Sequence, residues 1–382
     1  MKIAILSTAA ASLVGFRKEL LQEIEKSNET YAMASDWVPQ IEREVASWGV
    51  QPIHCALARD GVNPVREIKG LIALTRQFSV LAPDIYFGYF PKPNTIGLLA
   101  AYFAGVPRRY ALVEGLGYYF TERGIHPGWK ALLVRYIQIF LYRLALPRCT
   151  KVFFLNEDDR AELIKAGVSI HASMVLPGIG VDLEYYADID RYPDSPVFLM
   201  VSRLLVEKGV REFVAAARLV KARYSNARFL LAGGLDSNPG GIEGEEVKSW
   251  VSEGVLDWVG HVEDIRTVFA ESSVFVLPSY REGRPRSTQE AMAMARPIIT
   301  TDAIGCRETV DEGVNGFRVP VRNVAALAEA MNKFIETPDL VRKMGRQSRR
   351  IAEEKYNVHE INAAILRAMS IVVDDSHPAV DG

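Results

Sequence analysis

Short apolar runs alternate along this chain with longer segments of helical spacing, and this alternation restricts the possible folds more than any other feature of the sequence. The runs of the first half are KIAILS, TYAMAS, DIYFGY, RRYALV and KVFFLN. Each is followed by a stretch in which Leu, Ala and charged residues recur at the spacing of an α-helix. Because strands and helices alternate, we expect an α/β architecture with parallel sheets covered by helices on both faces.

A second series of runs begins after a segment at 177–196 that is rich in Gly, Pro and Asp. It starts with VFLMVS, continues through RFLLAG, VLDWVG, VFVL and PIITT, and ends in helical patterns over 325–335 and 338–368. No unit of about 20 to 50 residues repeats along the chain. The sequence therefore predicts two separate Rossmann-like units.

A length of 382 residues is enough for two domains. We place an N-terminal domain at 1–180, a linker at 181–196 and a C-terminal domain at 197–360. Residues 361–382 are expected to form the end of the last helix and a tail that packs back toward the N-terminal domain. Open sheets of this kind bind ligands beyond the carboxyl ends of their strands, so two facing domains would enclose a substrate in the cleft between them.

Composition excludes several classes of protein. With 49% hydrophobic and 24% charged residues, the chain has the profile of a folded globular protein rather than a disordered one. Cys55, Cys149 and Cys306 are far apart and form no CxxC pair, so we expect neither a disulfide framework nor a thiolate metal site, and a reducing cytosol fits best. No stretch reaches the roughly 18 uncharged apolar residues of a membrane span. Residues 1–16 resemble a signal peptide, but a buried first strand over Lys2–Ser7 is the simpler interpretation.

Charge is distributed unevenly. The first 180 residues carry four more basic than acidic side chains, and eight basic residues lie within 107–151 against two acidic ones. Such an excess suits phosphate or an anionic membrane surface, whereas the interleaved aliphatic residues argue against nucleic-acid binding. The segment 129–146, WKALLVRYIQIFLYRLAL, is apolar on nearly all sides but contains charges, which indicates a helix lying in a membrane interface. A core helix whose Arg135 and Arg143 reach solvent is the alternative.

Residues 278–310, PSYREGRPRSTQEAMAMARPIITTDAIGCRETV, hold the densest set of polar candidates. A loop after the strand VFVL leads into a helix that we expect to begin near Ser287, where exposed backbone amides and the helix dipole suit a phosphate. Thr288 lies beside these amides. Glu282 in the loop and Glu290 one turn into the helix can both face the strand ends, although each could instead be a solvated surface charge.

A second group of candidates lies in MVSRLLVEKGVREF, where the strand VFLMVS ends and a helix begins near Gly209. Arg203 and Lys208, five residues apart, could grip a diphosphate, the arginine by its planar fork and the lysine as a point charge. Solvated loop charges are the alternative interpretation.

Together these segments resemble the family 4 retaining glycosyltransferases of the GT-B fold, over residues 175–330. The resemblance rests on the spacing of Glu282-Gly283 and Glu290, on Ser202-Arg203 with Lys208-Gly209, on Gly180-Val181-Asp182 and on Asn315-Gly316-Phe317. With AGVPRRYALVEGLGYYF in the first half, the chain also looks like the subgroup that builds bacterial O-antigen, capsule and N-glycan precursors on undecaprenyl diphosphate. One activity of that subgroup adds N-acetylgalactosamine to lipid-linked diacetylbacillosamine.

The resemblance implies transfer of a hexose or N-acetylhexosamine from a nucleotide sugar, usually UDP-linked, with retained configuration and with no metal or other cofactor. Arg203 and Lys208 would neutralise the departing diphosphate, Glu290 would bind the ribose hydroxyls, and Glu282 would hold hydroxyls of the donor sugar. The donor site would be completed by Ser202, Gly283, Arg286, Ser287 and Thr288. The acceptor would be a lipid-diphosphate-linked saccharide, met by a peripheral enzyme on the cytoplasmic face of the cell membrane.

The chain departs from this family at two places. Many members carry a glycine pair after the first strand, whereas this loop runs from Ser7 to Ser12 without glycine. Many also carry a histidine where this chain has Glu114, followed by Gly115. Ser12, Glu114 and Gly115 are therefore candidate sugar or acceptor contacts, although Glu114 could instead be a buried carboxylate bonded to the glycine-rich backbone. His126 is either a plain loop residue or part of the acceptor entrance.

Other functions remain as alternatives. No G-x-G-x-x-G follows a strand, which disfavours a dinucleotide dehydrogenase. Asp188-Ile189-Asp190 copies a metal-binding motif of another glycosyltransferase class, but no strand precedes it, so we expect no metal there. A sugar-nucleotide epimerase can share two Rossmann-like units, and a non-catalytic nucleotide-sugar-binding protein could keep the same donor site.

Overall fold

The computed structural model describes the chain except for residues 58–62, 122–128, 194, 237, 239 and 372–382. The chain divides into two compact units. Among the described residues, those within Met1–Tyr119, Ile125–Leu176 and His359–Gly382 form unit 1, and those within Phe120–Gly124 and Pro177–Val358 form unit 2.

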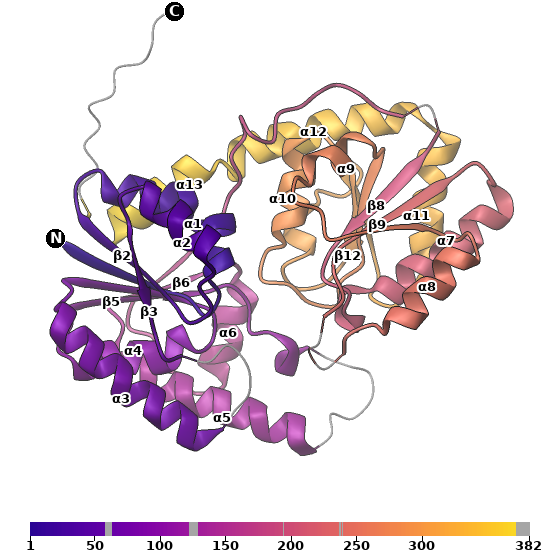
Figure 1. Cartoon of the computed structure of the whole chain (residues 1–382). Coiled ribbons are helices and arrows are strands. Elements are labelled where there is room, and N and C mark those ends of the chain that lie inside the picture. Colours follow the sequence, from indigo (N-terminus) through magenta and orange to yellow (C-terminus); the bar gives the residue numbers. More distant parts are fainter. Residues whose placement is uncertain (58–62, 122–128, 194, 237, 239, 372–382) are drawn as a thin grey trace, which may run out of the picture. The chain divides into compact units, whose positions relative to one another are not determined.

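Unit 1 is built on a parallel sheet with the strand order β3-β2-β1-β4-β5-β6-β7. Its strands are β1 (Lys2–Leu6), β2 (Glu29–Ala34), β3 (Gln51–His54), β4 (Ile85–Tyr89), β5 (Arg108–Val113), β6 (Lys151–Phe154) and β7 (Ser173–Val175). The helices are α1 (Ala10–Glu25), α2 (Pro39–Ser47), α3 (Pro64–Leu81), α4 (Leu98–Phe103), α5 (Trp129–Ala145), α6 (Glu157–Lys165) and α13 (Val358–Ala368). Figure 1 shows α1, α2 and α13 on one face of this sheet and α3, α4 and α5 on the other.

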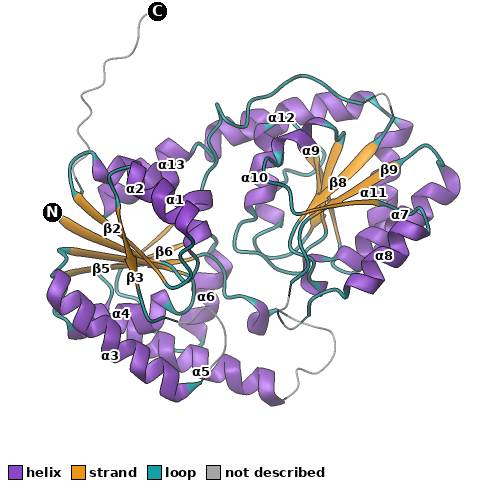
Figure 2. Cartoon of the chain, in the orientation of Figure 1, coloured by secondary structure: helices purple, strands orange, loops and turns teal. Residues whose placement is uncertain are grey.

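Unit 2 contains a second parallel sheet, in the order β10-β9-β8-β11-β12-β13. Its strands are β8 (Val197–Val201), β9 (Arg228–Ala232), β10 (Asp257–Gly260), β11 (Val274–Leu277), β12 (Ile298–Thr301) and β13 (Gly316–Val319). The helices are α7 (Val210–Arg223), α8 (Gly244–Ser252), α9 (Arg266–Ala270), α10 (Arg286–Ala293), α11 (Val324–Glu336) and α12 (Asp339–Lys355), as Figure 2 shows. Both sheets are parallel and flanked by helices, so the predicted α/β class is confirmed.

The central strands are buried on both faces, as the continuous apolar runs predict. All five residues of β4 are buried, and so are all four of β11 and all four of β12. In unit 2 the core includes the rings of Phe198 and Phe229, whose centroids lie 5.3 Å apart.

The predicted linker at 181–196 is not a separate segment, because it is bonded to the rest of unit 2. The Val181 amide donates to the Tyr356 carbonyl at 2.9 Å, and the Tyr192 hydroxyl donates to the Ala295 carbonyl at 3.0 Å. The Val358 amide in turn donates to the Val181 carbonyl at 3.1 Å. These bonds also explain why the helical pattern predicted over 338–368 is interrupted: the chain leaves α12 to pair with this segment before α13 begins.

In both sheets the strand order reverses beside the first strand, between β1 and β4 in unit 1 and between β8 and β11 in unit 2. Such switch points open a crevice at the carboxyl ends of the strands, where open α/β sheets bind their ligands. Both switch points are therefore candidate ligand-binding positions.

Candidate active site

Lys208 and Glu282 meet at the switch point of unit 2. Lys208 follows β8 and Glu282 follows β11, and Lys208 Nζ donates to Glu282 Oε1 at 2.6 Å. The two side chains are only 17% and 12% exposed, so this ion pair is mostly withdrawn from water. Sequence reasoning proposed both residues separately, and the fold brings them into contact. An ammonium has three donors, so a lysine that bonds one carboxylate oxygen can still donate to a phosphate.

Two glycines allow the loops that carry this pair to approach each other. Gly209 has φ +75°, and a Cβ there would lie 2.2 Å from the carbonyl oxygen of Pro278. Gly305 has φ +78°, and a Cβ there would lie 2.2 Å from the carbonyl oxygen of Glu282. Only glycine tolerates both the left-handed conformation and the close approach. The backbone of Glu282 is fixed further by its amide, which donates to the Ile304 carbonyl at 2.9 Å.

Arg203 has a different partner from Lys208. Its Nη1 lies 3.0 Å from Asp236 Oδ2, and its side chain is 55% exposed. Burial alone would raise the pKa of Asp236, but the Asn238 amide and the Arg203 guanidinium together hold that pKa below its usual range. Asp236 was not singled out in the sequence, because no local pattern joins it to Arg203.

Glu207, beside Lys208, is a further acidic group that sequence reasoning missed. Burial raises its pKa, although its own backbone amide, Lys208 and Arg203 act in the opposite direction. Its Oε2 atom is buried without a hydrogen-bond partner among the described residues. Three hydroxyl oxygens of unit 2 are in the same condition, those of Ser202, Ser279 and Thr288. Ser202 follows β8, Ser279 follows β11 and Thr288 lies in the first turn of α10, so unsatisfied polar atoms gather at this crevice.

Glu290 is held by two donors from different elements. Its Oε1 accepts from the Tyr186 hydroxyl and from Arg286 Nε, each at 2.9 Å. Burial, followed by the charge of Glu290, raises the pKa of Tyr186, so the phenol stays a donor. Arg286 lies one turn before Glu290 on α10, and Tyr186 comes from the segment that was expected to be a linker. The carboxylate is therefore fixed in position one turn into α10.

Helix α10 begins at Arg286, one residue before the predicted start at Ser287. Ser287 is half-buried in its first turn, and Gly283 is buried in the preceding loop. The buried amide of Gln289, another residue that the sequence did not indicate, accepts from the Gly180 amide at 3.1 Å. This bond anchors the Gly180-Val181-Asp182 turn to α10. That turn is one of the motifs that carry the family resemblance, and its role here is structural.

The switch point of unit 1 has different chemistry. Ser12 Oγ lies 2.9 Å from the Tyr89 hydroxyl and 2.8 Å from Ser7 Oγ, which links the loop after β1 to the end of β4. At the first turn of α1, the Ala10 amide donates to Asp36 Oδ1 at 2.6 Å. A carboxylate thus takes the place at which a phosphate could approach this helix.

Glu114 follows β5 in unit 1, and its carboxylate pairs with the guanidinium of Arg17 from α1. One partner of this carboxylate is therefore a buried arginine, which the sequence did not suggest. Gly115, next in the chain, has φ +128°. His126 lies outside the described residues.

Helix α5 presents a row of exposed apolar side chains. Trp129 is 70% exposed and Tyr136 is 69% exposed. The row contains Trp129, Leu132, Leu133, Tyr136, Ile137, Phe140 and Leu144, which recur three or four residues apart on one side of the helix. The opposite side is anchored by Tyr142, which is fully buried. The interpretation of α5 as a plain core helix is therefore wrong, because its apolar side chains and not only its arginines reach the surface. Among the described residues, no helix combines the length and apolar character needed to cross a membrane.

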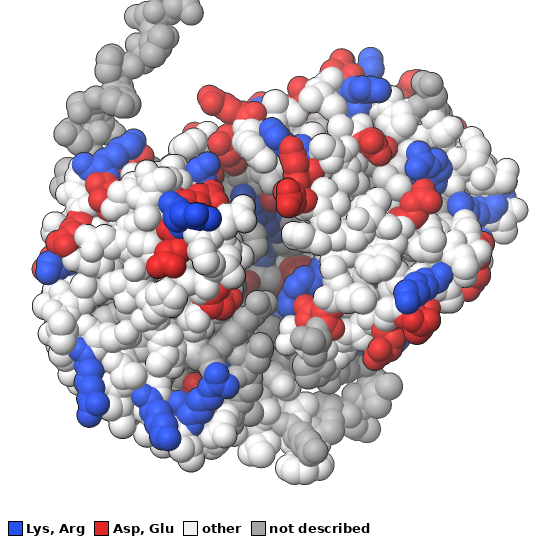
Figure 3. All heavy atoms as spheres, viewed as in Figure 1, with Lys and Arg blue, Asp and Glu red and all other residues white. Residues whose placement is uncertain are grey.

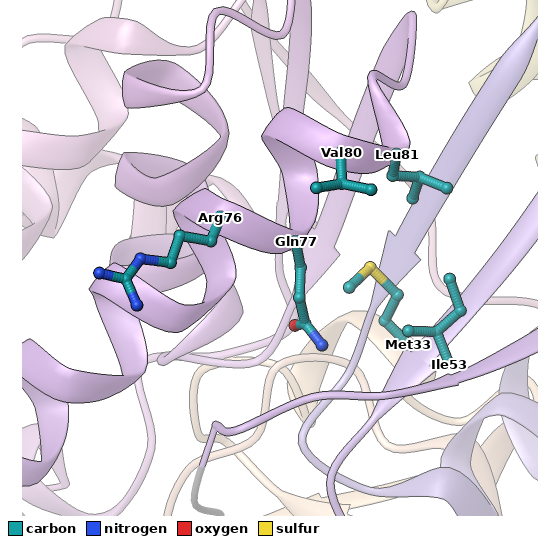
Figure 4. A pocket seen from close by; sticks show the side chains of 6 residues that line it. All are labelled: Met33, Ile53, Arg76, Gln77, Val80 and Leu81. Atoms are coloured by element: carbon teal, nitrogen blue, oxygen red, sulfur yellow. The ribbon is translucent and has the colours of Figure 1, made fainter.

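Two other features of the surface bear on binding chemistry. On the face that Figure 3 shows, basic and acidic side chains are interspersed over each unit. A hollow of about 370 Å³ lies between α3 and the strands β2 and β3. Its walls are Met33, Ile53, Arg76, Gln77, Val80 and Leu81. Figure 4 shows the guanidinium of Arg76 directed away from Met33 and Ile53, so this apolar hollow offers no cationic grip for a diphosphate.

Asp188 and Asp190 form an exposed turn rather than a cluster of ligands. Asp188 Oδ1 accepts from the Asp190 amide at 2.8 Å, and Arg342 Nε lies 3.6 Å from Asp190 Oδ1. Within the described part of the chain, no group of three or more His, Cys, Asp or Glu residues is arranged to hold a metal ion.

Comparison with known proteins identifies the family. Residues 195–337, which include Lys208, Glu282 and Glu290, match the family model described as glycosyl transferases group 1. The chain is 30% identical to the N,N'-diacetylbacillosaminyl-diphospho-undecaprenol alpha-1,3-N-acetylgalactosaminyltransferase of Campylobacter jejuni, over 89% of this chain and 91% of that protein. The protein is a member of this glycosyltransferase family.

A second relative of this glycosyltransferase is the UDP-Gal:alpha-D-GlcNAc-diphosphoundecaprenol alpha-1,3-galactosyltransferase of Escherichia coli, which is 25% identical over 71% of each chain. Among solved structures, Anabaena Alr3699/HepE in complex with UDP and glucose matches with a TM-score of 0.73 and 17% identity, over 97% of this chain and 100% of that one. These comparisons confirm the predicted GT-B class and the enzyme class of the protein.

Proposed function

We propose that this glycosyltransferase moves a hexose or N-acetylhexosamine from a UDP-linked donor to a saccharide carried on undecaprenyl diphosphate, in the assembly of a surface polysaccharide or glycan precursor. The names of the Campylobacter jejuni and Escherichia coli relatives, both of which act on diphosphoundecaprenol-linked sugars, support the acceptor class. The observation that carries the proposal is the Lys208–Glu282 pair at the switch point of unit 2.

The proposed chemistry follows from the charge that develops when the donor breaks. The bond between the anomeric carbon and the diphosphate oxygen breaks, and a new bond forms to the acceptor hydroxyl oxygen. Negative charge grows on the departing diphosphate, where Lys208 and the first amides of α10 would stabilise it. The hydroxyl proton passes to a phosphate oxygen of the departing group on the same face, so the configuration is retained. Because fixed donors supply this stabilisation, the proposed step uses no metal ion.

The remaining residues of unit 2 would orient the donor. Glu282, held by Lys208, accepts hydrogen bonds from hydroxyls of the donor sugar. Glu290, held by Tyr186 and Arg286, accepts from the ribose hydroxyls. Arg203 is exposed and retains the freedom to turn its fork toward the diphosphate.

An assay with a panel of donors tests the proposal. The protein is incubated with UDP- and GDP-linked sugars and undecaprenyl-diphosphate-linked saccharides, with and without EDTA, and the lipid products are weighed by mass spectrometry. We expect one added sugar from a UDP-linked donor, in equal yield with EDTA. Product that requires a divalent metal would contradict the metal-free step. Conversion of the nucleotide sugar without an acceptor would indicate an epimerase, and binding without turnover would indicate a non-catalytic protein.

We also propose that α5 places unit 1 on an anionic membrane surface. Its exposed row combines aromatic and aliphatic side chains, which partition into the interface between headgroups and acyl chains. The basic excess of residues 107–151 favours anionic lipids. The acceptor would then be met at the surface on which its lipid lies.

Vesicle flotation tests this placement with phosphatidylglycerol-containing liposomes. Replacing Trp129, Tyr136 and Phe140 together by serine should weaken binding at least about 10-fold, because the apolar area available to the membrane is lost. The matched control replaces Leu219 and Val251, exposed apolar residues of unit 2, by serine and should bind as the unaltered protein does. Equal binding by both variants would remove α5 from the membrane contact.

A further inference from the structure

Arg17 occupies an unusual position for an arginine on a helix. Its neighbours Phe16 and Lys18 are exposed, whereas Arg17 itself is 2% exposed and faces the sheet of unit 1. Its guanidinium carbon lies 4.6 Å from the centre of the Tyr89 ring, and its Nη1 donates to the Phe16 carbonyl at 3.0 Å. Its Nε is buried without a hydrogen-bond partner among the described residues. A guanidinium stays charged in proteins, so burying it is costly unless an anion compensates the charge.

That anion is Glu114. Arg17 Nη2 donates to Glu114 Oε1, and the two side chains are 3% and 14% exposed. The arginine is therefore enclosed, while the carboxylate retains contact with the surface at the carboxyl end of β5. Gly115 at φ +128° and Gly117 at φ +79° turn the following chain through conformations that favour glycine. The pair thus presents one fixed carboxylate at the ligand-binding end of the sheet.

The groups around this carboxylate suit a neutral, hydroxyl-rich ligand. Tyr89, under the guanidinium, bonds Ser12, which bonds Ser7 in turn. Burial raises the pKa of Tyr89 to about 12, although Arg17 opposes the shift, so the phenol keeps its proton. The first amide of α1 already donates to Asp36. An ionised carboxylate accepts hydrogen bonds from sugar hydroxyls but repels a phosphate.

We infer that Arg17 is a positioning residue that acts through Glu114, and that the carboxylate it holds accepts a hydrogen bond from a hydroxyl of one of the two sugar substrates. This inference rests on the proposed function, because it needs a transfer reaction to act on. It adds a residue outside the donor site of unit 2, and it assigns part of the choice of sugar to unit 1.

The test combines protein variants with substrates that each lack one hydroxyl. Once the unaltered protein has been shown to transfer a sugar, kcat and KM are measured for monodeoxy donors and acceptors. One of these analogues should lose about 10- to 100-fold in kcat/KM with the unaltered protein, as expected for a hydrogen bond to a charged group. With the Glu114→Gln and Arg17→Met variants, kcat/KM for the same analogue should be less than about 3-fold below kcat/KM for its parent substrate.

A double substitution distinguishes positioning from support of the fold. If Arg17 acts through Glu114, the Arg17→Met/Glu114→Gln protein should be no slower than the slower single variant, because both changes remove one interaction. Arg17→Lys keeps the positive charge but not the planar guanidinium, so it should recover part of the discrimination among analogues that Arg17→Met loses. The matched control is Arg109→Met, which alters a structural arginine at the opposite end of β5 whose Nε donates to the Arg148 carbonyl at 2.8 Å. This control should leave the discrimination among analogues unchanged.

Three results would overturn the inference while leaving the proposed function intact. The first is a fall in kcat/KM in the double variant that equals the product of the falls in the two single variants. The others are an equal fall in kcat/KM for every analogue in all variants, and full activity of Glu114→Gln. Should Arg17→Met fail to fold, Arg17→Lys and Glu114→Gln carry the same comparison. Absence of transfer by the unaltered protein would instead contradict the proposed function itself.

Discussion

The two sheets of this glycosyltransferase share the order of their first six strands, to which unit 1 adds β7, but they carry different side chains at their switch points. In unit 2 a lysine stands at the crevice, paired with Glu282, and an arginine follows the same strand. In unit 1 the crevice holds serine and tyrosine hydroxyls and the carboxylate of Glu114, which pairs with the enclosed Arg17. The fold therefore supplies two comparable positions at strand ends, and we propose that the one in unit 2 binds the diphosphate and the one in unit 1 binds a sugar.

Glycine contributes to the same difference. In unit 2, Gly209 and Gly305 let two loops come together beneath the Lys208–Glu282 pair. In unit 1 the loop from Ser7 to Ser12 has no glycine and is held by hydroxyl bonds instead, with Asp36 at the helix amide. The loop that lacks the glycine pair expected from the family resemblance thus has a carboxylate, that of Asp36, at the first amide of α1.

The largest expected effect on turnover is that of replacing Lys208, the cation at the switch point of unit 2. Lys208→Ala should reduce kcat by about 100-fold or more, because in the proposed mechanism Lys208 stabilises the negative charge of the departing diphosphate. Lys208→Arg should retain more activity, since the positive charge is kept. Kinetics should be measured at a temperature at which circular dichroism finds each variant folded, because Glu282 loses its partner. Turnover of the alanine variant near that of the unaltered protein would exclude Lys208 from the reaction.

A smaller effect is expected on the free energy of unfolding when one glycine of each unit is replaced by alanine. Gly209→Ala should destabilise the protein by about 2 kcal/mol or more, because φ is +75° and the new Cβ would overlap the Pro278 carbonyl. Gly15→Ala, at an exposed position in α1 where a Cβ would meet no atom within 4 Å, should stabilise it by about 0.5–1 kcal/mol. Guanidinium unfolding measures both. A tolerated alanine at 209 would refute the close packing of the loops at the unit 2 crevice.

The smallest effect concerns the exposed ion pair of unit 2. The folded pKa of Asp236 lies below its unfolded value of about 4, so its contribution is present above that value and is lost as pH falls through the folded pKa. Asp236→Asn should cost no more than about 1 kcal/mol at pH 7, because Arg203 is largely exposed. The difference in unfolding free energy between the two proteins should shrink as pH is lowered from 5 to 2. If the difference in unfolding free energy did not change with pH, the charge of the Asp236 carboxylate would contribute nothing to stability.

The sequence predicted those features of the fold and of the site that depend on residues close together in the chain. The alternation of apolar runs and helical segments predicted both sheets, and strand ends located Lys208, Glu282 and Glu290 before their contacts were known. Tyr186, Gln289 and Arg17 were missed because each meets its partner across about a hundred residues: Tyr186 reaches Glu290, Gln289 reaches Gly180, and Arg17 reaches Glu114. Pattern also gives no sign that a helical residue such as Arg17 faces inward, since an arginine on a helix is usually solvated.

The position of UDP on the protein tests the central claim most directly. In a crystal structure with UDP, we predict that Lys208 and the first amides of α10 contact the diphosphate while Glu290 accepts from the ribose hydroxyls. A nucleotide bound instead at Ser12 and Glu114 of unit 1, with no phosphate contact to Lys208, would contradict the account.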